Sequence, residues 1–514
     1  MRATDENSRK ICPYCTRTEW RSTMNVNINS DVNDAALQHE VGARGAVVKG
    51  NKPIDQLEAA NRFIAAQAHE KMHDNRLWDL RKKRDAQMHL IPEWEELRQL
   101  ASDIKEHTLD HLAHYLEMFE KNAKDNGIHV HWAQNAEECN SIAIELMKKR
   151  QTKILVKSKS MLGEECGLRK AVEKEGINVI ETDLGERIQQ LDNEDPSHVV
   201  VPAVHKSRTD VSRVFTKTLG AQAGNNDIHY LAETQRETNR PLILKAEVGM
   251  TGGNFLVAET GAVVVCTNEG NADLSANTPG LHIVTVGIEK IVPGLEHLAV
   301  FIRLLSRSAL GSPITQYTSY FRGPRHHGGE MHVILVDNTR STRLADKKFK
   351  AGLKCIRCGA CMNTCPVFRR SGGLSYGSTY AGPIGLILSP GYNAHKFRNL
   401  PFASTLNGSC SNVCPVKINI HEQIFEWRET LAEKGELSLA KRILMQAAGK
   451  ILGNPVLYRA AIKNADRALK YLPHFIVYNN LNKWGKQRDL PPAPKETFHG
   501  WYEKNYLKKE SVNE

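Results

Sequence analysis

The chain has 514 residues, 41% of them hydrophobic and 25% charged, which is typical of a soluble globular protein with two or three domains. No apolar run reaches the ~18 residues of a membrane-spanning helix, and the polar stretch 1–10 lacks the apolar segment of a secretory signal. Eleven cysteines fit metal ligation in a reducing compartment better than a disulfide framework, so we expect a cytoplasmic protein.

The first 55 residues are polar and rich in Asn, Asp and Gly, and they predict a mobile leader. Cys12 and Cys15 form a Cys-Pro-Tyr-Cys pair within it. That spacing suits a redox or half-zinc site, but neither the strand nor the helix that flanks a thioredoxin-type pair is evident. An incidental pair is therefore the favoured interpretation.

Residues 56–124 are strong helix formers with apolar residues at helical spacing. Leu109, Leu112, Leu116 and Phe119 predict one buried stripe. Pro92 is expected to separate two long helices, because proline cannot continue a helix from its interior. We expect these helices to clamp the neighbouring domain.

Residues 128–340 alternate short apolar strands with helical segments, for example helices at 136–149 and 207–219. This alternation predicts an α/β fold with a mainly parallel sheet covered on both faces. In such sheets ligands bind beyond the carboxyl ends of the strands. The strand candidates are 153–156, 178–181, 199–202, 255–258, 262–266, 282–286 and 332–336.

The most informative motif is the run Cys355, Cys358, Cys361, Cys365 followed by Pro366, with a second Cys-Pro at Cys414. This is the C-x2-C-x2-C-x3-C-P run of bacterial ferredoxins, in which the fourth cysteine ligates a different cluster. We therefore predict one [4Fe–4S] cluster on Cys355, Cys358, Cys361 and Cys414. Zinc prefers separated cysteine pairs and is disfavoured.

A second cluster has an incomplete set of ligands. A full ferredoxin repeat would place cysteines at 404, 407, 410 and 414, and this chain has Ser404, Asn407, Cys410 and Cys414. Only Cys365 and Cys410 remain as thiolates for the second site, and oxygen ligands suit iron–sulfur chemistry poorly. Two alternatives stay open, a labile second cluster or one cluster only, and we favour one robust cluster.

Several strand-end segments could converge on an anion. Lys157 and Lys159 follow one predicted strand, and Gly252, Gly253 and Asn254 precede a predicted hairpin. Lysines and free backbone amides at glycines make an anion-binding nest for a carboxylate or a phosphate. The acid–base candidates are weaker, since such residues are more often structural; they are His205, Lys206, Glu259 and Glu269.

The C-terminal region is basic. Residues 439–488 contain ten Lys and Arg side chains and a single acidic one, Asp466. The excess suits a contact with an acidic partner or an anionic membrane surface, and a solvated helix face is the alternative. Nucleic acid is disfavoured, because no recognition motif is present and basic residues do not alternate with aromatic ones.

Long segments of the chain resemble the lactate-utilisation iron–sulfur family, the B component of a three-protein L-lactate oxidation system. The resemblance spans about residues 60–505 and departs from the family pattern at Asn407, where the family usually has cysteine. The matching segments are 104–109, 156–161, 181–186, 202–206, 249–255, 258–261, 267–271, 286–293, 373–392 and 488–491.

The resemblance implies an α/β lactate-utilisation domain, related in fold to sugar-phosphate isomerases and CoA transferases, followed by an all-α ferredoxin-like iron–sulfur module. The expected boundaries are 1–55 for the leader, 56–340 for the α/β domain with its N-terminal helices, 341–430 for the module and 431–514 for a basic helical region. Companion lactate-utilisation proteins A and C and a quinone-linked or peripheral membrane acceptor are the implied partners.

Three hypotheses remain for the function. The favoured one is an electron-transfer subunit of a complex that oxidises L-lactate to pyruvate and feeds the respiratory chain. The alternatives are a self-contained isomerase or CoA-transferase-like enzyme with a redox-sensing cluster, and a scaffold held together by the cluster. Hydride chemistry requires a flavin or nicotinamide, and no G-x-G-x-x-G motif is present. The hydride acceptor is therefore a flavin bound without a familiar motif or part of a companion protein.

Overall fold

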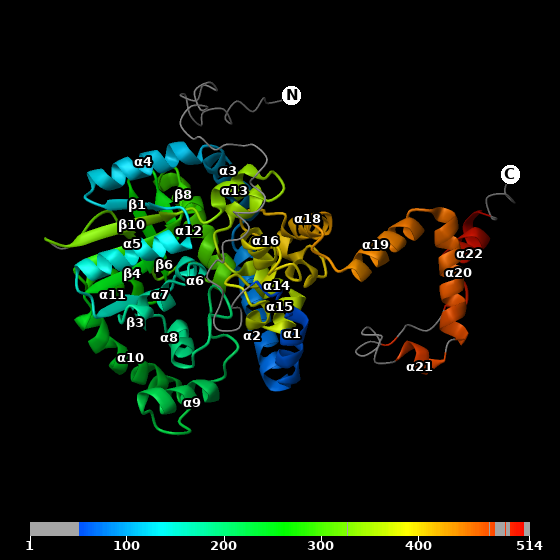
Figure 1. Ribbon diagram of the computed structural model, residues 1–514, viewed down its shortest axis with the longest axis horizontal. Coiled ribbons are helices and arrows are strands. Elements are labelled where there is room, and N and C mark those ends of the chain that lie inside the picture. Colours follow the sequence, from blue (N-terminus) through cyan, green and yellow to red (C-terminus); the bar gives the residue numbers. More distant parts are fainter. Residues whose placement is uncertain (1–50, 326, 472, 479–488, 490–493, 508–514) are drawn as a thin grey trace. The chain divides into compact units, whose positions relative to one another are not determined.

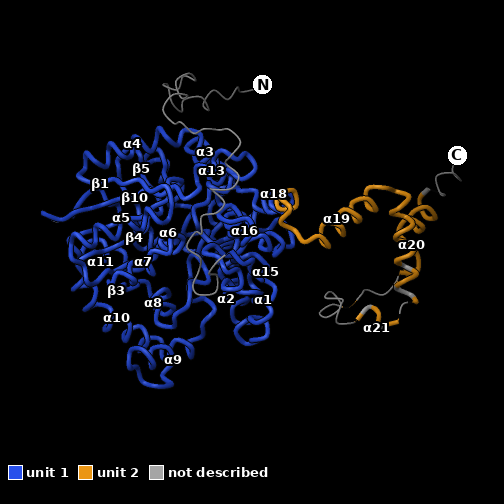
Figure 2. The backbone as a smooth tube through the Cα atoms, in the orientation of Figure 1, with its two compact units in different colours: residues 1–429 blue, residues 430–514 orange. Residues whose placement is uncertain are grey.

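The computed structural model describes residues 51–325, 327–471, 473–478, 489 and 494–507. The chain divides into two compact units, 1–429 and 430–514 (Figure 2). All but the last five residues of the predicted leader, Cys12 and Cys15 included, lie outside the described residues, as do Lys483, Lys486 and Arg488.

The first unit contains a parallel six-stranded sheet in the order β1-β10-β7-β4-β2-β3. Figure 1 shows β1, β10, β4 and β3 of this sheet among the surrounding helices. Every pairing within it is parallel, as the strand–helix alternation predicts. Its strands are β1 (His129–Ala133), β2 (Ile154–Lys157), β3 (Asn178–Glu181), β4 (Val248–Gly252), β7 (Leu281–Gly287) and β10 (Glu330–Val336).

Helices connect these strands along the chain. They are α5 (Ala136–Lys149), α6 (Met161–Glu165), α7 (Leu168–Lys174), α8 (Leu184–Leu191), α9 (Arg208–Leu219), α10 (Ile228–Lys245), α11 (Asn271–Asn277) and α12 (Leu295–Leu310). The helix α13 (Arg340–Ala345) follows the last strand.

Both faces of the sheet are buried. Successive strand residues point to opposite faces, and apolar residues pack on each of them. Leu155 and Ile283 pack with α5, α6 and α7 on one face. Val284 and Leu335 pack on the other face with a smaller four-stranded sheet and the helix α4 (Leu112–Asp125). This smaller sheet has the order β8-β5-β6-β9, with β5 (Phe255–Val257), β6 (Ala262–Thr267), β8 (Ile291–Val292) and β9 (Tyr317–Phe321).

Six of the seven predicted strands are present, but the strand predicted at 199–202 is wrong. These residues form a loop, in which the backbone N–H groups of Val200 and Val201 donate to Nδ1 of His198 at 3.1 and 3.2 Å instead of joining a sheet ladder. Strand β4 was not among the predicted strands. Its Gly249 permits close packing of α11, since a Cβ there would lie 1.6 Å from the carbonyl oxygen of Ser275.

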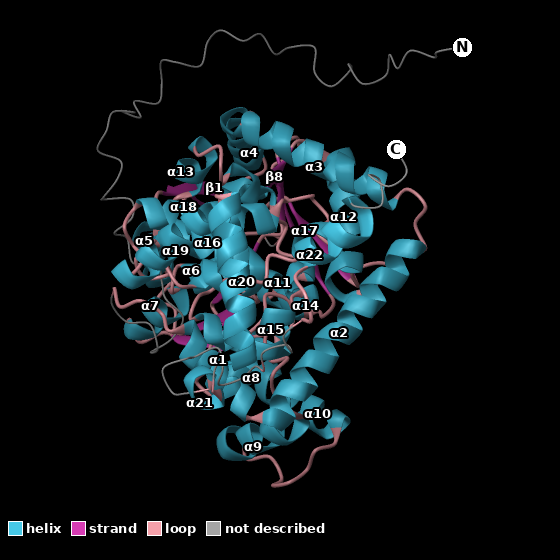
Figure 3. Ribbon diagram, turned by 90° about the vertical axis from the view of Figure 1, so that its right-hand side faces the viewer, coloured by secondary structure: helices cyan, strands magenta, loops and turns pink. Residues whose placement is uncertain are grey.

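The N-terminal helices are α1 (Gln56–Ala65), α2 (Gln67–His89), α3 (Trp94–Asp110) and α4. Figure 3 shows α2 as one long helix, which ends just before Pro92 as predicted. The predicted apolar stripe is buried, although it crosses from α3 to α4 at His111.

Residues 345–429, called the cysteine module below, contain helices and no strand among their residues, all of which the structure describes. The module lies in the same compact unit as the sheet. Its α-helices are α14 (Ala360–Thr364), α15 (Pro366–Ser371), α16 (Gly382–Tyr392), α17 (Ser409–Asn412) and α18 (Ile420–Glu433), the last of which continues into the second unit.

The second unit is helical where the structure describes it. Its helices after α18 include α19 (Leu439–Leu452), α20 (Pro455–Tyr471), α21 (His474–Val477) and α22 (Phe498–Tyr502). Across the described part of the chain, no helix has the length and apolar character needed to cross a membrane.

Candidate functional site

Four cysteines from the two ends of the cysteine module line one small cavity, called the cysteine cavity below. They are Cys355, Cys358, Cys361 and Cys414, and all four are free thiols. Within the described residues, no three Cys, His, Asp or Glu side chains lie close enough to hold a single metal ion. A [4Fe–4S] cubane is different, because it binds one thiolate at each of four irons and needs thiols spread around a space.

Tight backbone turns bring three of these thiols to one side of the loop. Arg357 and Gly359 have φ values of 61° and 76°, in the left-handed region. A Cβ at Gly359 would lie 2.9 Å from the ring of His198, so glycine meets both the conformation and the close contact. The turn leads directly into α14, which carries Cys361.

The rest of the cysteine cavity is mostly apolar. Burial raises the pKa of Cys358 to about 12 and that of Cys414 to about 11. A bound iron reverses this preference, because a coordinating thiol is deprotonated by the metal charge. The other wall residues are Val199, Ile356, Arg357, Gly359, Ile384, Pro415, Val416, Ile418 and Ile420.

Backbone and arginine donors fix the thiol-bearing loops. The N–H of Arg357 donates to Sγ of Cys355, and the N–H of Ile418 donates to Sγ of Cys414, both at 3.4 Å. Arg98 on α3 donates to the carbonyl oxygen of Cys414 at 2.8 and 3.0 Å. The helices before the α/β domain therefore hold the distant fourth cysteine in place, which agrees with the clamping role that we expected of them.

Cys365 and Cys410 do not line the cysteine cavity. Cys365 caps the N-terminus of α15, where its sulfur accepts from the N–H of Phe368 at 3.5 Å and Pro366 occupies the first helical position. Burial and then the nearby Cys365 raise the pKa of Cys410 to about 11. The oxygens of Ser404 and Asn407 accept from local N–H groups at 3.1 Å.

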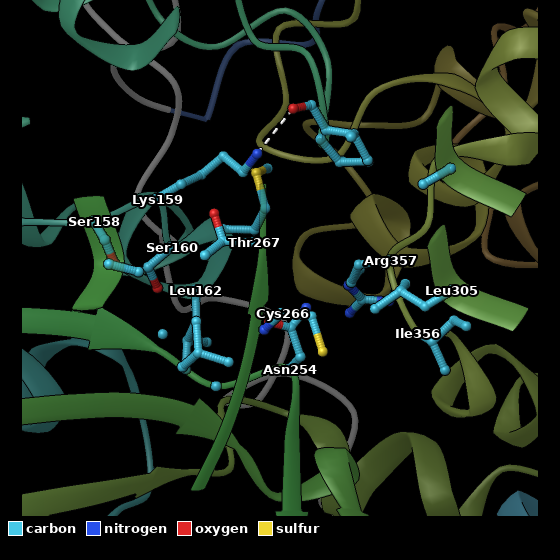
Figure 4. Close-up of a pocket in the computed structure, with 18 of the residues that line it drawn as sticks. Ser158, Lys159, Ser160, Leu162, Asn254, Cys266, Thr267, Leu305, Ile356 and Arg357 are labelled. Atoms are coloured by element: carbon cyan, nitrogen blue, oxygen red, sulfur yellow. Dashed lines mark hydrogen bonds between the residues drawn. The ribbon is translucent and has the colours of Figure 1, made fainter. Parts of the chain in front are cut away.

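A second and larger cavity, of about 310 Å³, lies at the carboxyl ends of β2, β4 and β7, and is called the strand-end cavity below (Figure 4). Its position is the one predicted for a ligand of a parallel sheet. Segments that line it include 158–162, 199–201, 252–254, 265–269 and 285–287, with Ile356, Arg357 and Tyr380 from the cysteine module.

The structure brings most of the predicted anion-binding residues to this cavity. Lys159, Gly252, Gly253 and Asn254 line it, and Nζ of Lys159 also donates to the carbonyl oxygen of Val200 at 2.8 Å. Lys157 is not among the lining residues.

Lys157 is instead fully buried in a cluster of carboxylates. Its Nζ lies 2.9 and 3.0 Å from the two carboxylate oxygens of Glu181 and 3.8 Å from Glu186. Burial disfavours its charge, but the carboxylates, Glu181 foremost, outweigh burial and raise the pKa of Lys157. These contacts give Lys157 a structural role.

The acid–base candidates are mostly elsewhere. His205 lies 3.0 Å from Glu194, Lys206 pairs with Glu194 at 2.9 Å, and Glu259 accepts from the N–H of Leu295 at the start of α12 at 3.1 Å. None of these three lines the strand-end cavity. Glu269 does line it, and burial, followed by the charge of Asp183, raises the pKa of this carboxyl.

The two cavities share part of their walls, which the sequence did not disclose. Val199, Ile356 and Arg357 line both. The backbone of Arg357 runs between two predicted cluster ligands, while its side chain enters the strand-end cavity (Figure 4). The signal in the sequence was a cation inside the first Cys-x-x-Cys, which the sequence analysis did not single out.

A buried ion network holds Arg357. Glu289 accepts from Nε of Arg340 at 2.5 Å and lies 3.4 Å from Nη2 of Arg357. Burial would raise the pKa of Glu289, but the surrounding cations, Arg340 foremost, lower it to about 2. Arg340 also forms two bonds with Glu165, to which the hydroxyl of Tyr380 donates at 2.6 Å.

Three family models match successive segments of the chain. Residues 116–341 match the family model of the LUD domain, residues 351–418 match the 4Fe-4S dicluster domain, and residues 427–506 match the lactate utilisation protein B C-terminal model. Lactate utilization protein B of Oceanobacillus iheyensis is 40% identical over 435 residues, covering 82% of this chain and 90% of the relative.

The chain belongs to the lactate utilization protein B family. The resemblance seen in the sequence is therefore confirmed, and so is the order of a LUD domain, an iron–sulfur domain and a C-terminal region. The family member of Geobacillus thermodenitrificans is 41% identical over 426 residues, covering 80% of this chain and 88% of the relative.

A solved structure also matches this chain. It is the crystal structure of a DUF162 family protein from Deinococcus radiodurans, 16% identical, covering 44% of this chain and 98% of the other. The TM-score is 0.24, and at this value the likeness supports no conclusion.

Proposed function

We propose that this chain is the iron–sulfur electron-transfer subunit of a complex that oxidises L-lactate to pyruvate and delivers the electrons towards the respiratory chain. The observation that carries the proposal is the wall shared by the strand-end cavity and the cysteine cavity. The relatives are named for lactate utilization, which supports lactate as the origin of the electrons.

The residues of the cysteine cavity fit an iron–sulfur cluster. Four buried or half-buried thiols form an all-sulfur set of donors, with apolar side chains between them. A [4Fe–4S] cluster held there would accept and release one electron at a time. Ile418 and its apolar neighbours would exclude water, and the N–H groups that reach Sγ of Cys355 and Cys414 would stabilise thiolate charge.

Lactate-dependent reduction tests the proposal. Anaerobic, iron-loaded protein mixed with companion proteins A and C and L-lactate is expected to develop the EPR signal of a reduced cluster, because only an electron-transfer role links lactate to these thiols. Omitting either the companions or lactate should leave the signal absent. If the signal never develops, or the isolated chain turns over a sugar phosphate or acyl-CoA whatever its redox state, the proposal is wrong.

We also propose one stable cluster per chain, with a weak second site at Cys365 and Cys410. Ser404 and Asn407 stand where a full repeat has cysteines, and their oxygens are already engaged in local turns. Anaerobically purified protein is therefore expected to contain about four irons per chain. A stable content of about eight, measured by iron and sulfide analysis, would contradict this.

The basic C-terminal helices are proposed as the docking surface for an acidic face of a companion protein. Arg459, Lys463 and Arg467 are exposed on α20 and spaced four residues apart, so they lie along one side of it. Reversing all three to Glu is expected to abolish co-purification with the companions at physiological salt, because like charges would then face each other.

A matched control carries the same change in net charge elsewhere. Lys71, Lys170 and Lys347 are exposed in the first unit, and their reversal to Glu should leave co-purification intact. Equal co-purification of both triple variants with the companions would reject a docking role. So would a result in which the α20 variant keeps its companions and loses only its binding to anionic vesicles.

A further inference from the structure

Two lysines beside the cysteine cavity bond to backbone oxygens and form no ion pair with a carboxylate of the described residues. Lys105 on α3 is 2% exposed, and its Nζ donates to the carbonyl oxygens of Glu289 and Ile291 at 2.5 and 3.3 Å. Lys290 is half-buried, and its Nζ donates to the carbonyl oxygen of Cys355 at 3.1 Å. Neutral oxygens leave the charge of an ammonium group uncompensated, whereas buried charges in proteins are normally paired. A negative group close to both lysines would therefore stabilise them.

The neighbouring ion network does not supply this negative charge. The carboxylate of Glu289 is shared by Arg340 and Arg357, and Arg340 also pairs with Glu165. Four cations thus meet two carboxylates, which leaves an excess of two positive charges. The cations are Lys105, Lys290, Arg340 and Arg357, and the carboxylates are Glu165 and Glu289.

The charge of a Cys355 thiolate reaches three of these cations. Burial lowers the pKa of Lys105 to about 7 and that of Lys290 to about 8, and a Cys355 thiolate is among the charges that oppose this effect at both. Burial also disfavours the charge of Arg357, but the opposing charges, Cys355 foremost, outweigh burial and raise its pKa. These directions agree with the contacts at Cys355, so the positive excess lies near the first cysteine of the ferredoxin run.

The guanidinium groups at the opposite side of the cysteine cavity are balanced. Arg98, which holds the fourth cysteine, lies 2.6 Å from a carboxylate oxygen of Glu95. Arg84, which donates to the carbonyl oxygen of Val413 at 3.3 Å, lies 2.8 Å from Asp85. Both arginines therefore have a carboxylate partner, in contrast to the two lysines at the first cysteine.

We propose that Lys105, Lys290 and Arg357, called the cationic wall below, raise the reduction potential of a cluster held in the cysteine cavity. A cubane cluster on four thiolates is negatively charged, and an added electron makes it more negative. Fixed positive charge beside the first cysteine therefore stabilises the reduced form more than the oxidised form. The inference rests on the proposed function and names the residues that suit a ferredoxin-type cluster to lactate, because a 2-hydroxy acid is a mild reductant.

Reduction of the anaerobic, iron-loaded chain by dithionite, followed by EPR at a series of fixed potentials, tests the inference at about pH 6.5, below the pKa of both lysines. Lys290→Met should make one-electron reduction at least about tenfold less favourable, a fall in midpoint potential of at least about 59 mV, because a positive charge beside the cluster is lost. Lys290→Arg keeps the charge and should retain the wild-type potential. Lys347 is exposed in the cysteine module, so the control Lys347→Met should leave the potential unchanged.

Lys105→Met keeps the test decisive if Lys290→Met loses iron. Lys105 bonds to backbone oxygens outside the cysteine module, so its replacement should lower the potential at unchanged iron content. An unchanged potential in the iron-loaded methionine variants of the cationic wall would overturn the inference. So would an equal fall in Lys347→Met, or a potential of Lys290→Arg as low as that of Lys290→Met.

The inference and the proposed function fail in different ways. If the potentials are unchanged while lactate with the companions still reduces the cluster, the inference falls and the proposed function stands. If the potentials fall as expected while lactate never reduces the cluster, the cationic wall stands and the proposed function falls.

Discussion

Cys358→Ser is expected to remove the cluster of the cysteine cavity, with iron falling from about four per chain to nearly none. Cys358 is 7% exposed and lines the cavity together with three other thiols, so no outside ligand replaces it readily. A serine hydroxyl is a harder ligand with a much higher pKa than a thiol, and it binds iron weakly. Iron analysis and the EPR signal of the dithionite-reduced protein measure the loss.

Two other cysteine variants make this test specific. Cys12→Ser should leave the iron content unchanged, because Cys12 is far in sequence from the ferredoxin run. Cys410→Ser should also retain most of the iron, because Cys410 does not line the cysteine cavity. Circular dichroism of each variant separates cluster loss from unfolding. Retention of four irons by folded Cys358→Ser would disprove the ligand set.

The meeting of the four thiols was predictable from two motifs together, because the ferredoxin run supplies three thiols to one cluster and the second Cys-Pro supplies the fourth. The helix α5 and the strand β3 were also found at their predicted bounds, since their apolar periodicity is strong. The LUD and iron–sulfur domains were assigned through long matching segments, which carry more information than any single motif. Local patterns therefore identified the chemistry of the cysteine module.

Other long-range contacts were beyond the sequence. The loop at 199–202 has the composition of a strand, yet the ring of His198 takes the backbone donors that a sheet would use. Arg357 joins the two cavities only because the cysteine module packs against the strand ends. Tertiary packing of this kind produces no periodic pattern in the sequence, so it could not be predicted from the sequence.

Lys157 shows the same limit at a single residue. A lysine at the end of a strand, followed by Ser158 and Lys159, has the pattern of an anion site. Only the folded chain reveals that glutamates distant in the sequence, Glu181 and Glu186, lie around its ammonium group. One of two neighbouring lysines therefore lines the cavity, while the other neutralises buried carboxylates.

Lys157→Met is accordingly expected to destabilise the sheet by about 3–5 kcal/mol near pH 8, because removing one partner leaves buried charge uncompensated. Burial already raises the pKa of Glu181 and Glu186 above the ordinary 4.5, and loss of the lysine raises it further. Each carboxyl then keeps a proton in the folded chain that the unfolded chain releases. The associated stability is present below about pH 4.5 and is lost as the pH rises, so the variant should be nearly as stable as the wild type at pH 5.

Hydrogen exchange in β2 and β3, measured on iron-loaded protein at pH 5 and pH 8, reports this difference as local opening free energy. Lys153→Met is the control, since Lys153 is exposed just before the same strand and its loss should change stability by less than about 0.5 kcal/mol. An equal loss at both pH values would reject the carboxylate explanation. Unchanged exchange at pH 8 would also reject it, because a lysine that neutralises buried charge must change the stability of the strands that carry it.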